Sequence, residues 1–117
     1  MRWRLTAVSL VAALAAACAS PTLPLPPPEE IAVAPGPDAD HVTLTAMCGG
    51  APRNVVIIVV NEGFTAPVPL DKAVGGAITD PTCGKWDSTV YAHSGDLLDI
   101  TYELSGQISQ PALLRVP

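Results

Sequence analysis

The chain has 117 residues, of which 49% are hydrophobic and 15% are charged, and it contains 13 prolines, 9 glycines and 3 cysteines. This length accommodates one small domain with appended segments and excludes a two-domain enzyme. Residues 18–117 carry eleven acidic and four basic side chains, a formal charge of −7. Because no Lys/Arg cluster is present to neutralise phosphates, the composition argues against nucleic acid as a partner and against electrostatic docking on anionic lipid.

Residues 1–17 have the layout of a secretory signal peptide. A basic start with Arg2 and Arg4 precedes an apolar run over 5–17, and small residues come directly before Cys18. Crossing a hydrocarbon core takes about 20 apolar residues, so this run is too short for a permanent transmembrane helix. The sequence therefore predicts that residues 1–17 are removed on export. A simple cleavable signal is the alternative to the motif described next.

Residues 14–18, Leu-Ala-Ala-Ala-Cys, resemble a bacterial lipobox, although the leucine stands four places before the cysteine instead of three. In that motif small residues admit the peptidase, and the cysteine is acylated and becomes the new N-terminus. The resemblance implies that acylated Cys18 anchors the protein in a membrane, with more than one acyl chain for stable attachment. Ala19 and Ser20, with no aspartate after Cys18, resemble the enterobacterial signal for the bacterial outer membrane. Whether the protein faces the periplasm or the cell surface stays open.

The segment 18–40 reads as a lipidated N-terminus followed by a proline-rich linker. Seven prolines lie between Pro21 and Pro37, and four acidic side chains accompany them. Such composition favours extended polyproline II at about 3.1 Å per residue. We expect a disordered, semi-rigid spacer that holds a domain away from the bilayer. A peptide-ligand role for residues 23–28 is the alternative.

Residues 41–117 show no helical period and predict β-strands. Residues 41–46 alternate apolar and polar side chains, as in a half-buried strand. The unbroken apolar run over 55–60 has polar residues at both ends and predicts a central strand. The stretch 64–80 is interrupted by Pro and Gly, which suits short edge strands and turns.

Alternation is clearer after Gly84. Residues 86–92 and 98–104 predict two further strands, and a last strand is expected over 112–116. We expect Trp86 to fill the core beside Tyr102. Short strands separated by turn signals predict an all-β sandwich.

The turn and core residues of this region carry a further resemblance. Gly84, Lys85 and Trp86 enter one strand, Gly95 and Asp96 precede the next, and Gly106 and Ser109 precede the last. This order resembles bacterial immunoglobulin-like domains of extracellular proteins. The resemblance implies that residues 41–117 form an immunoglobulin-like β-sandwich. Because these are structural positions, it implies nothing about activity.

Cys48 and Cys83 remain as an even pair in an exported chain, which favours a disulfide. The bridge would tie the end of the strand 41–46 to the loop before Trp86. A redox or nucleophilic thiol is the alternative, but the chain lacks a CxxC spacing and a basic neighbour other than Lys85.

Residues 93–96, His-Ser-Gly-Asp, contain the letters of a catalytic triad. Consecutive residues in a tight turn cannot form its relay of hydrogen bonds, so a polar turn is predicted. Calcium could use Asp38, Asp40 and His41, or Asp96 and Asp99, but no ladder of ligands has the required spacing. His41 and His93 form no zinc pattern. We therefore predict neither a metal site nor a cofactor.

These observations favour a non-catalytic lipoprotein. Its partners are expected to be the membrane, through acylated Cys18, and an unidentified protein or glycan. The immunoglobulin-like module would serve a structural, adhesive or protein-interaction role in the cell envelope. The alternative is a glycan- or small-ligand-binding module, with Phe64 and Tyr91 as candidate contacts because they are aromatic and predicted to be exposed.

Overall fold

The computed structural model describes residues 23–117. The signal sequence 1–17 and Cys18 lie outside the described residues, as do the lipoprotein and membrane predictions that rest on them. Within residues 23–117, no helix has the length and apolar character needed to cross a bilayer.

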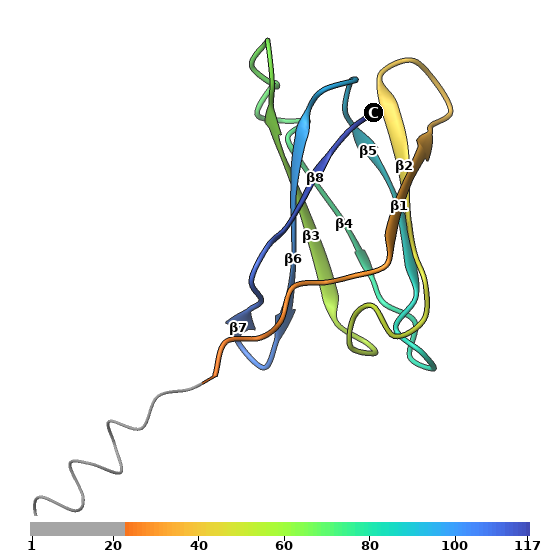
Figure 1. Ribbon diagram of the computed structural model, residues 1–117, viewed down its shortest axis with the longest axis vertical. Helices are drawn as coiled ribbons and strands as arrows, with labels where there is room; N and C mark the ends of the chain where they lie inside the picture. The colour runs from red at the N-terminus through yellow and green to blue at the C-terminus, as the bar shows by residue number, and fades with distance from the viewer. Residues whose placement is uncertain (1–22) are drawn as a thin grey trace, which may run out of the picture.

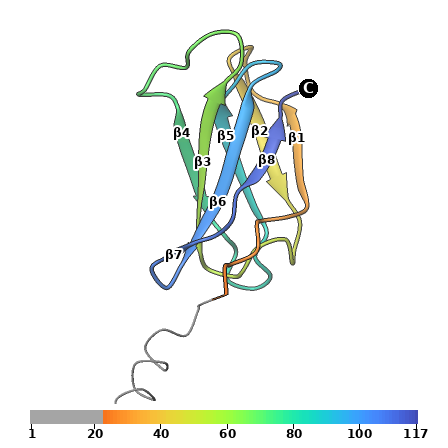
Figure 2. The ribbon, with the colours of Figure 1, turned by 60° about the vertical axis from the view of Figure 1, so that its left-hand side comes forward.

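The described chain folds into two antiparallel sheets packed face to face (Figures 1 and 2). The first sheet has the order β1-β2-β5 and consists of β1 (Ile31–Pro35), β2 (His41–Ala46) and β5 (Trp86–Tyr91). The second has the order β4-β3-β6 and consists of β4 (Val74–Ile78), β3 (Val56–Gly63) and β6 (Leu97–Leu104), with β7 (Gln107–Ile108) and β8 (Ala112–Arg115) both pairing with β6. The prediction of an all-β, sandwich-like domain is confirmed.

The core lies between the sheets and is built by alternation. In β2, β5 and β6 every second side chain is buried, while those between face outward. Trp86 and Tyr102 are 5% and 2% exposed, which confirms their predicted place in the core.

Strand β3 is central, as predicted, because it pairs with β4 on one side and β6 on the other. Its inner residues Ile57 and Val59 are buried. Its outer residues are not, and Val56 is 47% exposed. An unbroken apolar run is typical of strands covered on both faces. Within residues 23–117, no element covers the outer face of β3.

The linker prediction is wrong for residues 23–40. Strand β1 lies inside that segment and pairs with β2 from Ile31 opposite Ala46 to Pro35 opposite Val42. Ile31 and Val33 pack against the core. Pro35 is tolerated because β1 is an edge strand, so one side of its backbone needs no partner.

The residues before β1 are also part of the sandwich. Leu25 packs against the core, and its carbonyl accepts a hydrogen bond from the Gln110 N–H at 3.0 Å. The Glu29 N–H donates to the Gly50 carbonyl at 2.8 Å. The folded unit therefore begins near Leu25, and not at His41.

The expected last strand is present as β8, but the short strand β7 was not foreseen. Ser105 and Gly106 have φ angles of 52° and 78°, the left-handed pair that a two-residue hairpin turn requires. Beyond β7, the Tyr102 N–H donates to the Ser109 hydroxyl at 3.0 Å instead of to a main-chain carbonyl. This side-chain hydrogen bond lies between the part of β6 that pairs with β7 and the part that pairs with β8.

The predicted Cys48–Cys83 disulfide is present, with a Cα–Cα distance of 5.0 Å. It joins the β2–β3 loop to the β4–β5 loop. The Gly49 N–H also donates to the Cys83 carbonyl at 3.0 Å. Both loops lie at the end of the sandwich where the described chain enters, at the bottom of Figure 1.

Candidate functional site

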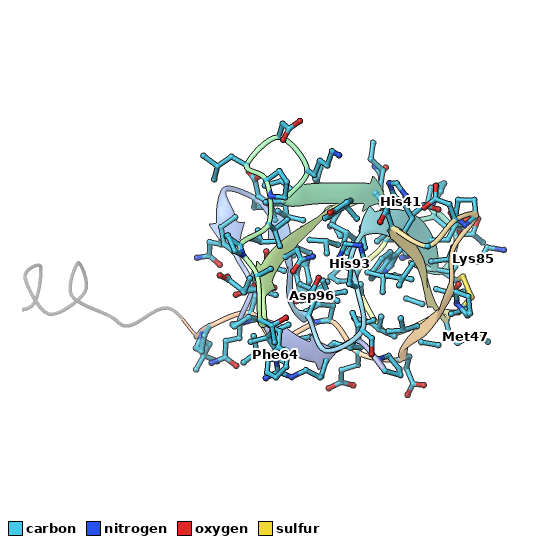
Figure 3. All side chains as sticks on the ribbon, turned by 90° about the horizontal axis from the view of Figure 1, so that it is seen from above. His41, Met47, Phe64, Lys85, His93 and Asp96 are labelled. Carbon is cyan, nitrogen blue, oxygen red and sulfur yellow. A yellow bond between two sulfur atoms is a disulfide. The ribbon has the colours of Figure 1, made fainter. Side chains whose placement is uncertain are left out.

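The end of the sandwich opposite the chain entry gathers most of the candidate functional side chains. The β1–β2, β3–β4 and β5–β6 connections meet there with the C-terminus, at the top of Figure 1. Figure 3 views the molecule from this end and labels His41, His93, Asp96 and Phe64. We call this region the loop end.

Tyr91, the last residue of β5, is the centre of a cluster at the loop end. The rings of His41 and His93 lie edge-on to the Tyr91 ring, with centroid distances of 5.9 Å and 5.0 Å. The Lys72 Nζ lies 5.2 Å from the same ring's centroid, within cation–π range. We call Tyr91 with His41, His93 and Lys72 the Tyr91 cluster.

Each histidine of the cluster contacts one carboxylate of the β1–β2 turn. His41 Nδ1 lies 2.7 Å from Asp38 Oδ1, and His93 Nε2 lies 2.8 Å from Asp40 Oδ1. The His41 side-chain hydrogen bond and the Asp40 backbone N–H hold the pKa of Asp38 below its ordinary value. These contacts orient both imidazoles against Tyr91.

A buried network of hydrogen bonds holds the backbone of the Tyr91 cluster in place. Asn61 Nδ2 donates to the Tyr91 carbonyl at 2.8 Å and to Asp96 Oδ2 at 3.0 Å. The same Asp96 oxygen accepts from the His93 N–H at 2.9 Å. Asn61 and Asp96 are 6% and 7% exposed. Asp96 therefore fixes the start of the β5–β6 loop.

A pocket of about 320 Å³ lies beside the cluster, between β1, β2 and the β5–β6 loop. Its apolar lining includes Val33, Val42, Ala92 and Val116, and its polar lining includes Asp38, His41, His93 and Ser94. An apolar floor with a few polar groups at the rim is typical of sites for small ligands. The groups at this rim can exchange hydrogen bonds with a polar ligand.

Phe64, the other predicted ligand contact, belongs to a different cluster. It is 67% exposed in the β3–β4 connection, and the Arg115 Cζ lies 5.3 Å from its ring centroid. Arg115 also donates to the Gly95 carbonyl at 2.9 Å. In Figure 3, Asp96 lies between Phe64 and His41. The structure therefore assigns Tyr91 and Phe64 to separate parts of the loop end.

Residues 93–96 form a turn, in which the Asp96 N–H donates to the His93 carbonyl at 3.0 Å. Asp96 meets His93 only through the His93 backbone, while the His93 imidazole contacts Asp40. In the described part of the chain, no three or more His, Cys, Asp or Glu side chains are grouped so as to hold a metal ion. Asp96 is buried, whereas Asp99 projects from the outer side of β6.

The sequence groups Asp38, Asp40 and His41 as neighbours, but it does not indicate that His41 and His93 meet around Tyr91. The β2–β5 register places His41 directly opposite Tyr91, and this register is known only once the strands are paired. Nor does the sequence indicate Lys72 and Asn61, which come from segments far away along the chain. Comparisons of the chain with protein-family models, with curated proteins and with solved structures give no match.

Proposed function

We propose that this protein is a non-catalytic lipoprotein of the bacterial outer membrane whose immunoglobulin-like domain binds a partner through its loop end. The anchor is inferred from the lipobox-like residues 14–18 and from Cys18. The immunoglobulin-like assignment is supported by the strand order, β1-β2-β5 against β4-β3-β6-β8, in which the chain changes sheet after β2, β4 and β5.

The observation that carries the proposal is the Tyr91 cluster at the last residue of β5, because the β5–β6 connection lies at the end of the sandwich opposite the one where the described chain enters (Figure 1). A chain held at its N-terminus by Cys18 would present this end away from the bilayer. Tyrosine combines a rigid apolar ring with a polar hydroxyl, and such residues recur in recognition surfaces. Two imidazoles and one ammonium around it supply hydrogen bonds, which suits a protein or a glycan.

Binding of a small ligand or glycan is the second candidate function, and the 320 Å³ pocket favours it. In that case the contacts would come from His41 and His93, which line the pocket, while Tyr91 would only support the two imidazoles and Phe64 would not take part. A calorimetric glycan screen tests this candidate. Heats of binding that disappear in His93→Ala, at a residue that lines the pocket, would support it, and a screen without binding would reject it.

Metabolic labelling with palmitate tests the anchor. We expect the wild-type chain to take up label and to fractionate with the outer membrane, and the Cys18→Ser variant to do neither. The double variant Cys48→Ser/Cys83→Ser is the matched control, because it removes thiols that are not proposed to be acylated. Label retained by Cys18→Ser would contradict the proposal.

Site-directed photo-cross-linking in cells tests the loop end. A photoreactive residue in place of Ser94, beside the pocket, is expected to give one discrete adduct, and Tyr91→Ala should weaken that adduct about tenfold. The same photoreactive residue at Gln107, at the far end of the molecule, is the control position. Adducts of equal strength at both positions would contradict binding through the loop end.

A further inference from the structure

The outer face of the second sheet carries an aliphatic surface that no described element covers. The β3–β4 register pairs Val56 with Ile78 and Val60 with Val74, so all four side chains point to the same side, together with Ile58. Ile78 and Val74 are 70% and 64% exposed. We call these five residues the aliphatic stripe. Figure 2 shows β4, β3 and β6 side by side.

The next strand adds negative charge to the same face. In the β3–β6 register, Glu103 lies opposite Val56, Thr101 opposite Ile58, and Asp99 opposite Val60. Val56, Ile58 and Val60 thus each have an aliphatic or glycine neighbour on β4 and a polar neighbour on β6. Among residues 23–117, neither Asp99 nor Glu103 forms an ion pair with a Lys or Arg. We call Asp99 and Glu103 the acidic column.

A solvent-facing strand surface normally carries polar side chains, and contiguous exposed aliphatics mark interaction sites. The aliphatic stripe breaks this rule on two adjacent strands, one of which is the edge strand β4. The stripe runs along the side of the sandwich, and only its Val74 end borders the Tyr91 cluster, where Val74 lines a pocket with Lys72 and Tyr91. Most of the stripe is therefore a second surface, distinct from the loop end.

We propose that the outer face of β4, β3 and β6 docks a basic amphipathic segment of another protein, with aliphatic side chains on the stripe and Lys or Arg side chains against the acidic column. Charge complementarity selects this occupant. Desolvation by the bound apolar side chains would strengthen the pairing between the carboxylates and the cations. An anionic membrane is a poor fit, because Asp99 and Glu103 would be repelled.

A second copy of this chain that packs with its β3 on β3 is also a poor fit. A two-fold axis through β3 can run along the strands or across them. Along the strands, it places the acidic column over the aliphatic β4 of the other copy. Across the strands, it places carboxylate against carboxylate. Either arrangement buries Asp99 and Glu103 without a cation, which is costly.

A photoreactive amphipathic peptide of leucine and lysine, mixed with the purified full chain, tests the proposal. We expect cross-links to map to β3 and β4, and binding to weaken as salt rises. Val74→Ser/Ile78→Ser should weaken binding about tenfold. Both residues are exposed, so the variant keeps its fold, which thermal denaturation verifies. Leu70→Ser, at a 94% exposed leucine in a loop, is the matched control and should change nothing.

The charge requirement is tested separately. Asp99→Asn/Glu103→Gln should weaken binding and flatten its salt dependence, whereas Asp87→Asn, on the outer face of the other sheet, should not. If Asp87→Asn weakens peptide binding as much as Asp99→Asn/Glu103→Gln does, the peptide is attracted only to the net charge of the protein, and the proposal is overturned. A leucine/glutamate peptide that binds equally well would overturn it. So would a wild-type dimer, seen by analytical ultracentrifugation, that Val74→Ser/Ile78→Ser dissociates.

Discussion

Asn61 is the residue on which the candidate site most depends. Its amide joins three parts of the chain: Nδ2 donates to the Tyr91 carbonyl and to Asp96, and Oδ1 accepts from the Gly63 N–H at 2.8 Å. Asn61 and Asp96 are buried beneath the loop end, at 6% and 7% exposure, so water reaches their polar atoms poorly. A buried amide with all its contacts made specifies one arrangement of the surrounding backbone.

Asn61→Ala removes a partner from the Tyr91 carbonyl, from the Gly63 N–H and from the Asp96 carboxylate, which keeps only the His93 N–H. We expect it to lower the free energy of unfolding by about 2–3 kcal/mol, because each buried unpaired polar group carries its own desolvation cost. Urea denaturation measures the change. Glu62→Ala, at the exposed neighbouring position, should stay within about 0.5 kcal/mol of the wild type. A similar loss in both variants would contradict the special role of Asn61.

Asp80 gives the fold an acid dependence. The N–H groups of Thr82 and Cys83 donate to Asp80 Oδ1 at 2.7 Å and 3.0 Å, and they lower the pKa of Asp80 below its ordinary value of 3.8. Because its pKa is lower in the folded state, its stabilising effect is present above pH 3.8 and is lost as pH falls through the folded value. Asp38 contributes in the same direction.

Asp80→Asn keeps an acceptor oxygen but cannot titrate. We therefore expect the wild type to lose stability more steeply than this variant as the pH is lowered below 3.8. Thermal melts across this pH range compare the two proteins. Parallel curves would show that the lowered pKa of Asp80 has no effect on folding.

At the scale of elements, two features hold the entry end of the sandwich together: the disulfide and the segment from Leu25 to β1. The Cys48–Cys83 bridge spans a sequence separation of 35 residues and connects loops from the two sheets. The segment before β1 forms backbone hydrogen bonds with Gly50, in the β2–β3 loop, and with Gln110, between β7 and β8. Both compensate for the small core of a domain this short.

Cys48→Ser/Cys83→Ser should lower the free energy of unfolding by about 3–4 kcal/mol, the chain-entropy value for a loop of this length. Chemical denaturation of the variant and of the reduced wild type should agree. If reduction leaves the wild type unchanged, the bridge does not limit unfolding.

Deleting residues 23–40 tests the corrected domain boundary. This truncation removes β1 and exposes the apolar groups that Ile31 and Val33 cover, so we expect a lower melting temperature or no cooperative unfolding. A chain that starts at residue 23 is the matched control. If the two truncations melt alike, the segment 23–40 contributes nothing to the fold.

At the scale of the whole molecule, the early start of the sandwich shortens the proposed spacer. Only residues 19–24 separate Cys18 from Leu25, so the folded unit can stand at most about 25 Å from an anchor at Cys18. The disulfide end would face the bilayer and the loop end would face away (Figure 1). The outer face of β3 and β4 would then be presented sideways.

Fluorescent labels at two positions test this orientation. In lipid vesicles, a lipid-phase quencher should act more strongly on a label at Arg53→Cys, in the β2–β3 loop, than on one at Ser94→Cys, at the loop end. The Cys18→Ser background is the control and should show no difference between the labels. Stronger quenching at Ser94→Cys would reverse the proposed orientation.

Alternation was enough to predict β2, β5 and β6, because each has one buried face and a period of two reports directly on burial. The disulfide could also be predicted, because Cys48 and Cys83, the two cysteines left after Cys18 in an exported chain, have one way to pair. Strand β1 was missed because the surrounding prolines outweighed the alternation of Ile31 and Val33. Proline excludes a central strand but not an edge strand, and only the sheet order shows which one it is.

The residue pattern by itself thus determined the fold class, the core aromatics Trp86 and Tyr102, and the disulfide pair, because these depend on local period and composition. The tertiary structure decided the start of the domain, the meeting of His41 and His93 at Tyr91, the separation of Phe64 from that cluster, and the exposure of the outer face of β3. Each of these depends on strand pairing and register between segments distant in sequence. No local pattern specifies which strand lies beside which.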